Sequence, residues 1–230
     1  MTFDIYQLDQ MYPDEDDTGQ ALENYQDALL EQFSGSPEGQ AYLQDHPGMG
    51  FWINQLIYYG YIYLGVTIPR MTEDDVEEII TDLFARKISL VADNDGSDAI
   101  PELVAFWQYL KREYKLPDAD AILKFLHQIE PRFKSIMNDP SKFGMAKSFM
   151  MMGQEAGFDM TSEEDINKFM LYYNATMAAQ NRGLDMPLPG PAPFFEPFGE
   201  RSTSLSRAEQ AKKKKRRKLA KASKKKNRKK

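Results

Sequence analysis

The segment LVAFWQYLKREY, residues 103–114, decides the fold class that this sequence predicts. Apolar side chains recur in it at intervals of three and four, at Leu103, Phe106, Trp107, Leu110 and Tyr114. That spacing places them on one face of an α-helix and leaves the other face to polar side chains. The helix is expected to end before Pro117, because a proline disfavours helical backbone in the residue that precedes it. Residues 103–114 therefore predict an amphipathic helix packed against a core.

The same spacing recurs on both sides of this segment, through residues 21–33, 72–84, 118–137 and 161–177. No stretch shows the alternating pattern of a convincing strand, and no internal repeat of solenoid period is found. A composition of 42% hydrophobic and 12% aromatic residues supplies a core for a domain of this size. The sequence therefore predicts an all-α fold, with a single domain of seven or eight helices over residues 18–180.

Helix start signals support these segments. Ser36, followed by a proline, predicts a short helix that ends before His46, and Thr72 precedes three acids that favour a helix N-terminus. The motif TSEE, residues 161–164, has the form of a capping box, and Asp139 is expected to start another helix. Pro131 is expected to kink or split the helix over residues 118–137.

Residues 49–69 (MGFWINQLIYYGYIYLGVTIP) raise the question of a membrane span, because about twenty residues pass without a charge. Two amides, Asn54 and Gln55, lie inside this stretch together with three glycines. Its tyrosines fall near the middle, whereas a spanning helix places tyrosine at its two ends. We expect a central core helix rather than a span. The acidic N-terminal arm, residues 1–17, lacks the basic and apolar parts of a signal peptide, so none is expected.

Catalytic and metal-binding patterns are weak in this sequence. The absence of cysteine excludes thiolate metal sites, disulfides and cysteine nucleophiles, and it favours a cytoplasmic protein. His46 and His127 belong to no recognisable catalytic arrangement. Residues 91–102 partly match a calcium loop, but Val91 occupies the first ligand position, so an acidic turn is expected. We therefore predict a non-enzymatic protein with no catalytic residue, no metal and no cofactor.

Charge divides the chain into two opposite parts. Residues 201–230 carry 16 Lys or Arg and one acid, a net charge of +15, whereas residues 1–200 carry 13 basic and 34 acidic side chains, a net charge of −21. This basic tail has few apolar residues and is expected to be disordered. Its densest part predicts a polyanion-binding site that comprises Lys212, Lys213, Lys214, Lys215, Arg216, Arg217, Lys218, Lys221, Lys224, Lys225, Lys226, Arg228, Lys229 and Lys230.

The composition of the tail indicates which polyanion it binds. Lysine acts as a point charge with little ability to read bases, and no aromatic residues are interleaved for stacking. Nucleic-acid binding without sequence preference is therefore predicted, with RNA or the ribosome first and DNA second. An anionic membrane surface and, in a eukaryote, a nuclear-localisation signal share the same physics. The expected location is the cytoplasm, with ribosome or nucleoid association, or the nucleus in a eukaryote.

A different reading makes the protein a helical protein–protein adaptor whose tail serves localisation or solubility. Residues 181–200 form a Pro-rich and Phe-rich linker, in which Phe194, Phe195 and Phe198 either pack on the helical domain or bind a partner. The methionines Met150, Met151 and Met152 fit either a core or a partner-binding groove, because methionine repacks readily. The oligomeric state is left open.

Three stretches of this chain resemble an uncharacterised all-helical bacterial domain family. They are FARKISL (84–90), FWQYLKREYKLPDADA (106–121) and FGMAKSFMMMGQEAGFDM (143–160), and the similarity covers roughly residues 35–180. The resemblance implies a helical, cytosolic protein. Some members of that family carry a cysteine-rich zinc motif that this chain lacks, so no metal site carries over. No activity and no catalytic residue are implied.

Overall fold

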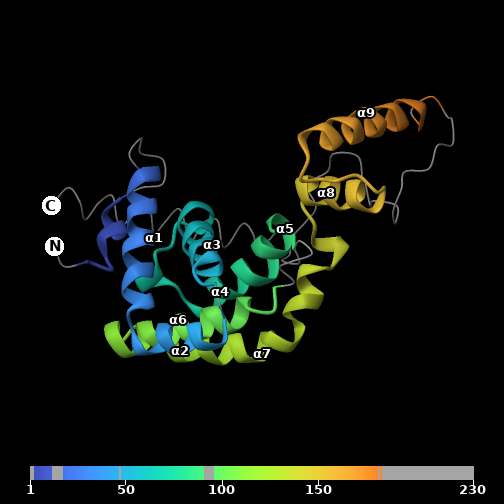
Figure 1. Ribbon diagram of the computed structural model, residues 1–230. Coiled ribbons are helices and arrows are strands. Elements are labelled where there is room, and N and C mark those ends of the chain that lie inside the picture. Colours follow the sequence, from blue (N-terminus) through green and yellow to red (C-terminus); the bar gives the residue numbers. More distant parts are fainter. Residues whose placement is uncertain (1–2, 12–17, 47, 91–95, 181, 183–230) are drawn as a thin grey trace, which may run out of the picture. The chain divides into compact units, whose positions relative to one another are not determined.

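The structure, a computed structural model, describes residues 3–11, 18–46, 48–90, 96–180 and 182, and these belong to one compact unit. The described residues form eight continuous helices and no strand (Figure 1). The α-helices are α1 (Thr18–Ser34), α2 (Pro37–Asp45), α3 (Phe51–Tyr59), α4 (Glu73–Glu78), α5 (Ala85–Lys87), α6 (Ala99–Tyr114), α7 (Ala119–Met137), α8 (Met145–Glu155) and α9 (Glu163–Gln180). The predicted all-α domain of seven or eight helices is confirmed.

Two of the eight helices contain a wider π-helical part. The helix that begins as α3 continues through η2 (Gly60–Leu64), and α4 continues through η4 (Ile79–Phe84) into α5. Short 3₁₀ turns, η1 (Gln7–Gln10), η3 (Ile68–Arg70) and η5 (Pro140–Lys142), connect the longer elements. Segments with i→i+5 hydrogen bonds are rare in proteins and occur mostly as single turns.

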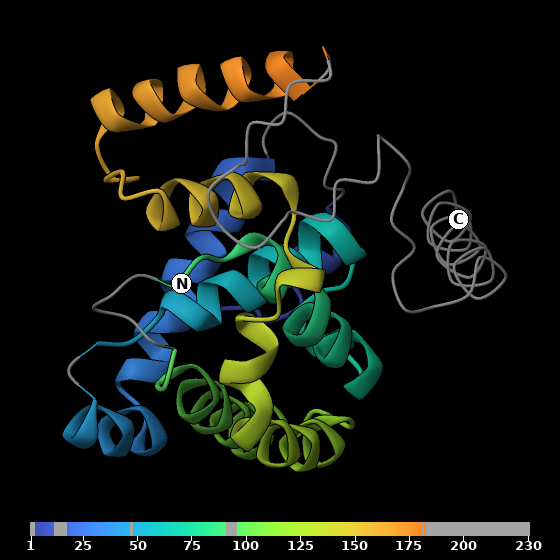
Figure 2. The ribbon, with the colours of Figure 1, turned by 90° about the vertical axis from the view of Figure 1, so that its right-hand side faces the viewer.

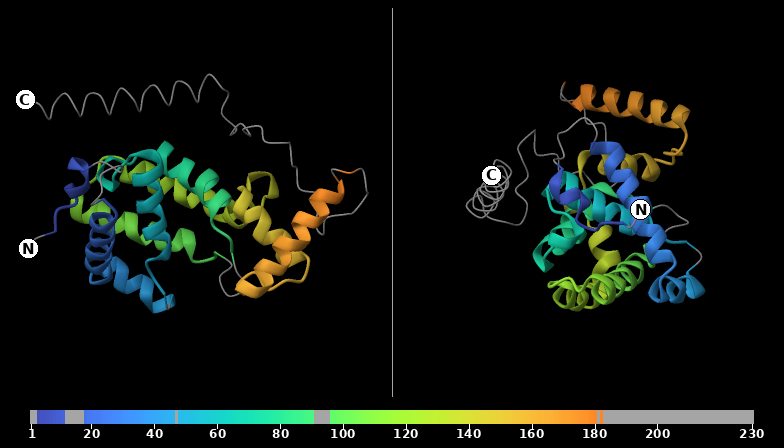
Figure 3. Two further views of the ribbon diagram at one scale, coloured as in Figure 1. Left: turned by 90° about the horizontal axis from the view of Figure 1, so that it is seen from above. Right: turned by 90° about the vertical axis from the view of Figure 1, so that its left-hand side faces the viewer.

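The segment that decides the fold class lies at the centre of the core. Helix α6 packs along α7 and against α2, and the views of Figure 3 show α6 and α7 side by side. The side chains of Phe106 and Trp107 are fully buried, and Phe33 of α1 meets Phe106 edge to face at 5.5 Å between ring centroids. Apolar burial on this scale is the main term that stabilises a helical domain.

Within residues 49–69, the expected core helix covers α3 and η2, residues 51–64. Trp52, Ile53 and Leu56 are fully buried within the domain. None of the described helices combines the length and the apolar character that crossing a membrane requires. The expectation of a core helix rather than a membrane span therefore holds in the part of the chain that the structure describes.

The helix start signals are confirmed at two of the predicted positions. The Ser36 hydroxyl accepts from the Gly39 N–H at 3.1 Å, and Thr72 forms a capping box with Asp75. At α9 the N-cap lies one residue later than predicted, and the reciprocal bond of a capping box does not form, because the Asp165 carboxylate accepts from the Asp159 N–H. There Ser162 accepts from the Asp165 N–H at 3.5 Å, because Thr161 instead donates to the Asp159 carboxylate at the preceding turn.

The helices near Pro131 and Pro140 differ from the prediction in detail. Helix α7 is assigned without a break through Pro131, and its ribbon bends along its length in Figure 1, so the kink is found and the split is not. Buried side chains on both sides of the proline, Ile129 and Phe133, hold both halves against the core. Asp139 caps only η5, and α8 begins five residues after Pro140, at Met145.

Candidate functional site

Helices α8 and α9 form a hairpin with a small core of its own, visible as the two upper helices in Figure 2. Met152, Met160 and Phe169 are buried together, and Phe149 packs against Phe169 at 4.8 Å between ring centroids. This cluster is separate from the large core of the domain. Of the methionines predicted to bind a partner, Met152 is buried here, whereas Met150 and Met151 are half-buried.

This hairpin exposes large apolar side chains. Met145 is 74% exposed and Leu171 is 72% exposed, and Met170 and Tyr172 are exposed as well. We call these four residues the hairpin face. Sequence reasoning missed Leu171 and Tyr172, although the run FMLYY, residues 169–173, carries the signal. Five consecutive apolar residues turn through about 400° of helix, so they cannot all face one core.

The hairpin is attached to the domain at the C-terminal end of the helix that spans residues 73–87. The Lys147 side chain is only 4% exposed, and its ammonium donates to the carbonyl oxygens of Ala85 at 2.9 Å and Met137 at 2.7 Å. The Gly144 N–H donates to the Arg86 carbonyl at 3.0 Å. Helix C-termini leave carbonyls without intrahelical partners and carry partial negative charge, which a lysine satisfies. Burial lowers the pKa of the Lys147 ammonium from 10.5 to about 8.

A second buried charge positions the N-terminus of α3. The Glu102 side chain, on α6, accepts from the Ile53 N–H at 2.9 Å, and Glu102 is 1% exposed. Next to it the Trp52 indole donates to Asp98 at 3.2 Å. Burial raises the pKa of the Glu102 carboxyl from 4.5 to about 7, although the backbone N–H donors oppose this rise. Because Glu102 serves as a helix cap, it is not available as the last ligand of a calcium loop.

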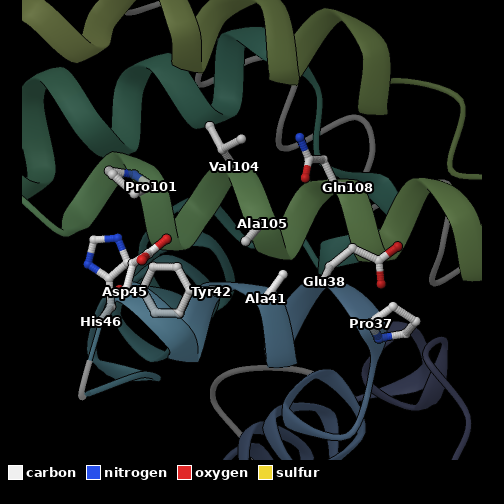
Figure 4. Close-up of a pocket in the computed structure, with 10 residues that line it drawn as sticks. All are labelled: Pro37, Glu38, Ala41, Tyr42, Asp45, His46, Pro101, Val104, Ala105 and Gln108. Atoms are coloured by element: carbon white, nitrogen blue, oxygen red, sulfur yellow. The ribbon is translucent and has the colours of Figure 1, made fainter.

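A shallow groove of about 470 Å³ lies between α2 and α6 (Figure 4). Tyr42 and His46 stack at 4.4 Å on one side, and Val104 and Gln108 of α6 lie on the other. At one end Glu38 forms a bidentate pair with Arg112, at 2.7 and 3.1 Å, which lowers the pKa of the Glu38 carboxyl. His46 is thus half-buried against Tyr42.

The candidates for catalysis and metal binding stay apart in space. His127 is an exposed residue of α7, and His46 lies at the end of α2. Within the described residues, no group of three or more His, Cys, Asp or Glu side chains is placed to hold a metal ion. Five residues of the calcium-like loop, residues 91–95, lie outside the described residues.

The predicted nucleic-acid and linker sites also lie outside the described residues, since these include only residue 182 beyond Gln180. This holds for the basic tail, residues 201–230, and for Phe194, Phe195 and Phe198. Both sets therefore stay predictions from the sequence.

Comparison with known proteins found no matching family model, no matching curated protein and no matching solved structure. This result is consistent with the resemblance to an uncharacterised helical family. No residue role is taken from a relative.

Proposed function

We propose that this protein binds RNA, most directly ribosomal or other structured RNA, through its basic tail and without sequence preference. The observation that carries the proposal is the separation of charge, with +15 on residues 201–230 and −21 on residues 1–200. In this proposal the protein is not an enzyme, uses no cofactor and acts in the cytoplasm. The helical domain presents its own surface to the assembly that the tail reaches.

Ion pairs in the helical domain support the proposal that the tail, rather than this domain, binds the phosphates. Five basic side chains there pair with neighbouring acids, namely Arg70 with Asp9, Arg86 with Asp82, Lys111 with Asp120, Arg112 with Glu38 and Lys168 with Glu164. A cation that already pairs with a carboxylate gains little from a phosphate, because the pair must first be broken. The tail, with one acid among 16 bases, offers phosphates the densest supply of cations in the chain.

Counterion release sets the expected strength of this binding. A tail that neutralises about six to ten phosphates loses on the order of 10³ to 10⁵ in affinity between 50 and 200 mM salt. Phosphate contacts of this kind provide affinity and position but carry no base information. Any preference for one RNA over another therefore has to come from the helical domain.

The test compares nucleic acid that co-purifies with the full-length chain at low salt and with a 1–200 truncation. A second full-length variant, in which Lys212–Arg217 are replaced by glutamine, keeps the chain length and removes six charges. We expect a high 260/280 nm absorbance ratio only for the unmodified chain, and we expect nuclease or 1 M salt to lower it. Equal ratios for all three proteins would contradict the proposal.

A second candidate function is that of a protein–protein adaptor, favoured by the hairpin face. Met145 and Leu171 are each more than two-thirds exposed on a hairpin that has its own small core. Large exposed apolar side chains that cluster on one element are typical of protein interaction sites. In this case the tail adds only localisation or solubility.

Deleting residues 201–230 separates the two functions. An adaptor keeps its protein partner after the deletion and loses it when Leu171→Glu places a charge in the hairpin face. An RNA-binding protein shows the opposite pattern, because Leu171→Glu leaves the tail unchanged.

A further inference from the structure

Three tyrosines gather at the C-terminal end of the helix that begins as α3. The rings of Tyr58 and Tyr63 lie 6.3 Å apart between centroids, and both contact Tyr59 at 5.4 Å. Tyr59 is buried against Phe84, whereas Tyr58 is 40% exposed and Tyr63 is 42% exposed. A buried tyrosine thus supports two rings that reach the surface.

The π-helical turn η2 explains how these two rings meet. In a regular α-helix each residue turns by about 100°, so residues five apart point about 140° away from each other. Tyr58 and Tyr63 are five apart and would not share a face. The i→i+5 bonding of η2 widens the turn, which brings Tyr63 back beside Tyr58.

The position of this turn depends on close approach to the neighbouring helix. A Cβ at Gly60 would lie 2.0 Å from Cε of Met71 and 3.6 Å from Cδ1 of Ile79, the first residue of η4. Gly65 ends the helix in a left-handed conformation with φ of 65°. The π-helical parts η2 and η4 thus lie close to each other at Gly60 and Ile79. π-Helical turns often occur at functional sites.

A lysine completes the surface. Lys87, the last residue of the helix over residues 73–87, is exposed and places its ammonium 4.7 Å from the centroid of the Tyr63 ring. We call Tyr58, Tyr63 and Lys87 the tyrosine platform. It combines two partly exposed aromatic rings, two hydroxyl groups and one cation. Those are the groups that contact the bases, the sugar hydroxyls and the phosphates of a single-stranded nucleic acid.

We propose that the tyrosine platform stacks bases of a single RNA strand that the basic tail already holds. This inference rests on the proposed function, because residues 1–200, with a net charge of −21, repel RNA on their own. Tethering removes that obstacle by raising the local concentration of the strand. Twenty-nine residues lie between Arg182 and Lys212, and a chain of that length can span up to about 100 Å, so the linker permits a strand on the tail to approach the helical domain.

The proposal predicts a base preference that the tail cannot produce. Stacking on an aromatic side chain contributes about 1–3 kcal/mol for each base and is stronger for larger ring systems. Oligoadenylate should therefore bind more tightly than oligouridylate of equal length. The loss of one stacked base corresponds to a decrease in affinity of about tenfold.

The experiment measures binding of fluorescein-labelled A20 and U20 oligoribonucleotides to the full-length chain by anisotropy at 100 mM NaCl. The double variant Tyr58→Ala/Tyr63→Ala should bind A20 about tenfold more weakly, with a smaller change for U20. Tyr58→Phe/Tyr63→Phe keeps the rings and should retain the preference. The matched control is Tyr6→Ala, which removes a tyrosine that is 43% exposed and belongs to no proposed site, and it should change neither affinity.

The outcomes separate this inference from the proposed function. If Tyr58→Ala/Tyr63→Ala binds A20 as tightly as the unmodified chain does, the platform does not stack on a base and this inference is wrong. That result would not contradict the proposal that the tail binds RNA. If the unmodified chain binds neither oligonucleotide at 50 mM NaCl, both proposals are wrong. Ultraviolet cross-linking to A20 should place the nucleotide on the peptide that contains Tyr58 and Tyr63, and cross-links only to residues 201–230 would also overturn the inference.

Discussion

Replacing Glu102 by glutamine should change how the stability of this protein depends on pH. The carboxyl caps α3, the helix that carries the tyrosine platform, and burial raises its pKa to about 7 from 4.5. In the unfolded chain the same group ionises near its ordinary value. Between these two values the unfolded state releases a proton that the folded state keeps, so the stability from this group is complete below pH 4.5 and is lost as the pH rises through 7.

The magnitude follows from the two pKa values. One pKa unit corresponds to about 1.4 kcal/mol, so the difference between 4.5 and about 7 amounts to about 3 kcal/mol of unfolding free energy. Glutamine has nearly the same shape and its amide oxygen can accept from the Ile53 N–H, but it does not ionise. The unfolding free energy of Glu102→Gln should therefore increase relative to that of the unmodified protein as the pH rises from 5 to 8.

Urea unfolding followed by tryptophan fluorescence at pH 5, 6, 7 and 8 measures this difference. Trp52, which donates to Asp98 beside Glu102, should report the change in its surroundings. The control is Glu155→Gln, which neutralises an exposed carboxyl of α8 and should follow the unmodified protein at every pH. If the free energies of Glu102→Gln and the unmodified protein run parallel from pH 5 to pH 8, the reasoning about this buried carboxyl is refuted.

Other substitutions test the packing and the attachment of the hairpin. Gly39→Ala should lower the unfolding free energy by about 1–3 kcal/mol in urea titrations, because its Cβ would lie 2.0 Å from the Phe33 carbonyl oxygen, which is backbone and cannot move aside; an unchanged midpoint would contradict the packing of α1 on α2. Lys147→Met leaves the carbonyls of Ala85 and Met137 without their donor, which costs about 1–3 kcal/mol of unfolding free energy for each carbonyl. Removing a buried charge offsets only part of this cost. Hydrogen exchange should therefore speed up about tenfold in α8 and stay unchanged in α6, and equal protection in both proteins would show that the lysine does not hold the hairpin. Arg112→Ala breaks a surface pair with Glu38 and should leave the midpoint of the same urea assay almost unchanged, whereas a clear decrease would mean that this pair is more than a surface contact.

The helices were predictable because their residues repeat at intervals of three and four. Leu103, Phe106 and Trp107 are buried on one face of α6, and the caps at Ser36 and Thr72 form as expected. These features depend on neighbours within about one or two turns, which a single sequence displays directly.

The details that shape the candidate sites depend on longer-range contacts. The apolar spacing gave no sign of η2, because its i→i+5 bonding arises where Gly60 meets Met71 and Ile79. Glu102 caps a helix that begins about fifty residues earlier. Lys147 was missed, although its position inside the apolar run of α8 was a usable signal. Its partners, two carbonyls on other helices, could not be identified from sequence.

The salt dependence of RNA binding tests the central proposal most directly. The affinity of the full-length chain for U20, measured by anisotropy between 50 and 300 mM NaCl, should fall with a slope of log affinity against log salt of about −4 to −7, the value for six to ten phosphates on a single strand. With Lys212–Arg217 replaced by glutamine, the slope should become shallower by about 4. A slope near zero, or the same slope for both proteins, would contradict the proposal that the tail is the phosphate-binding part of this chain.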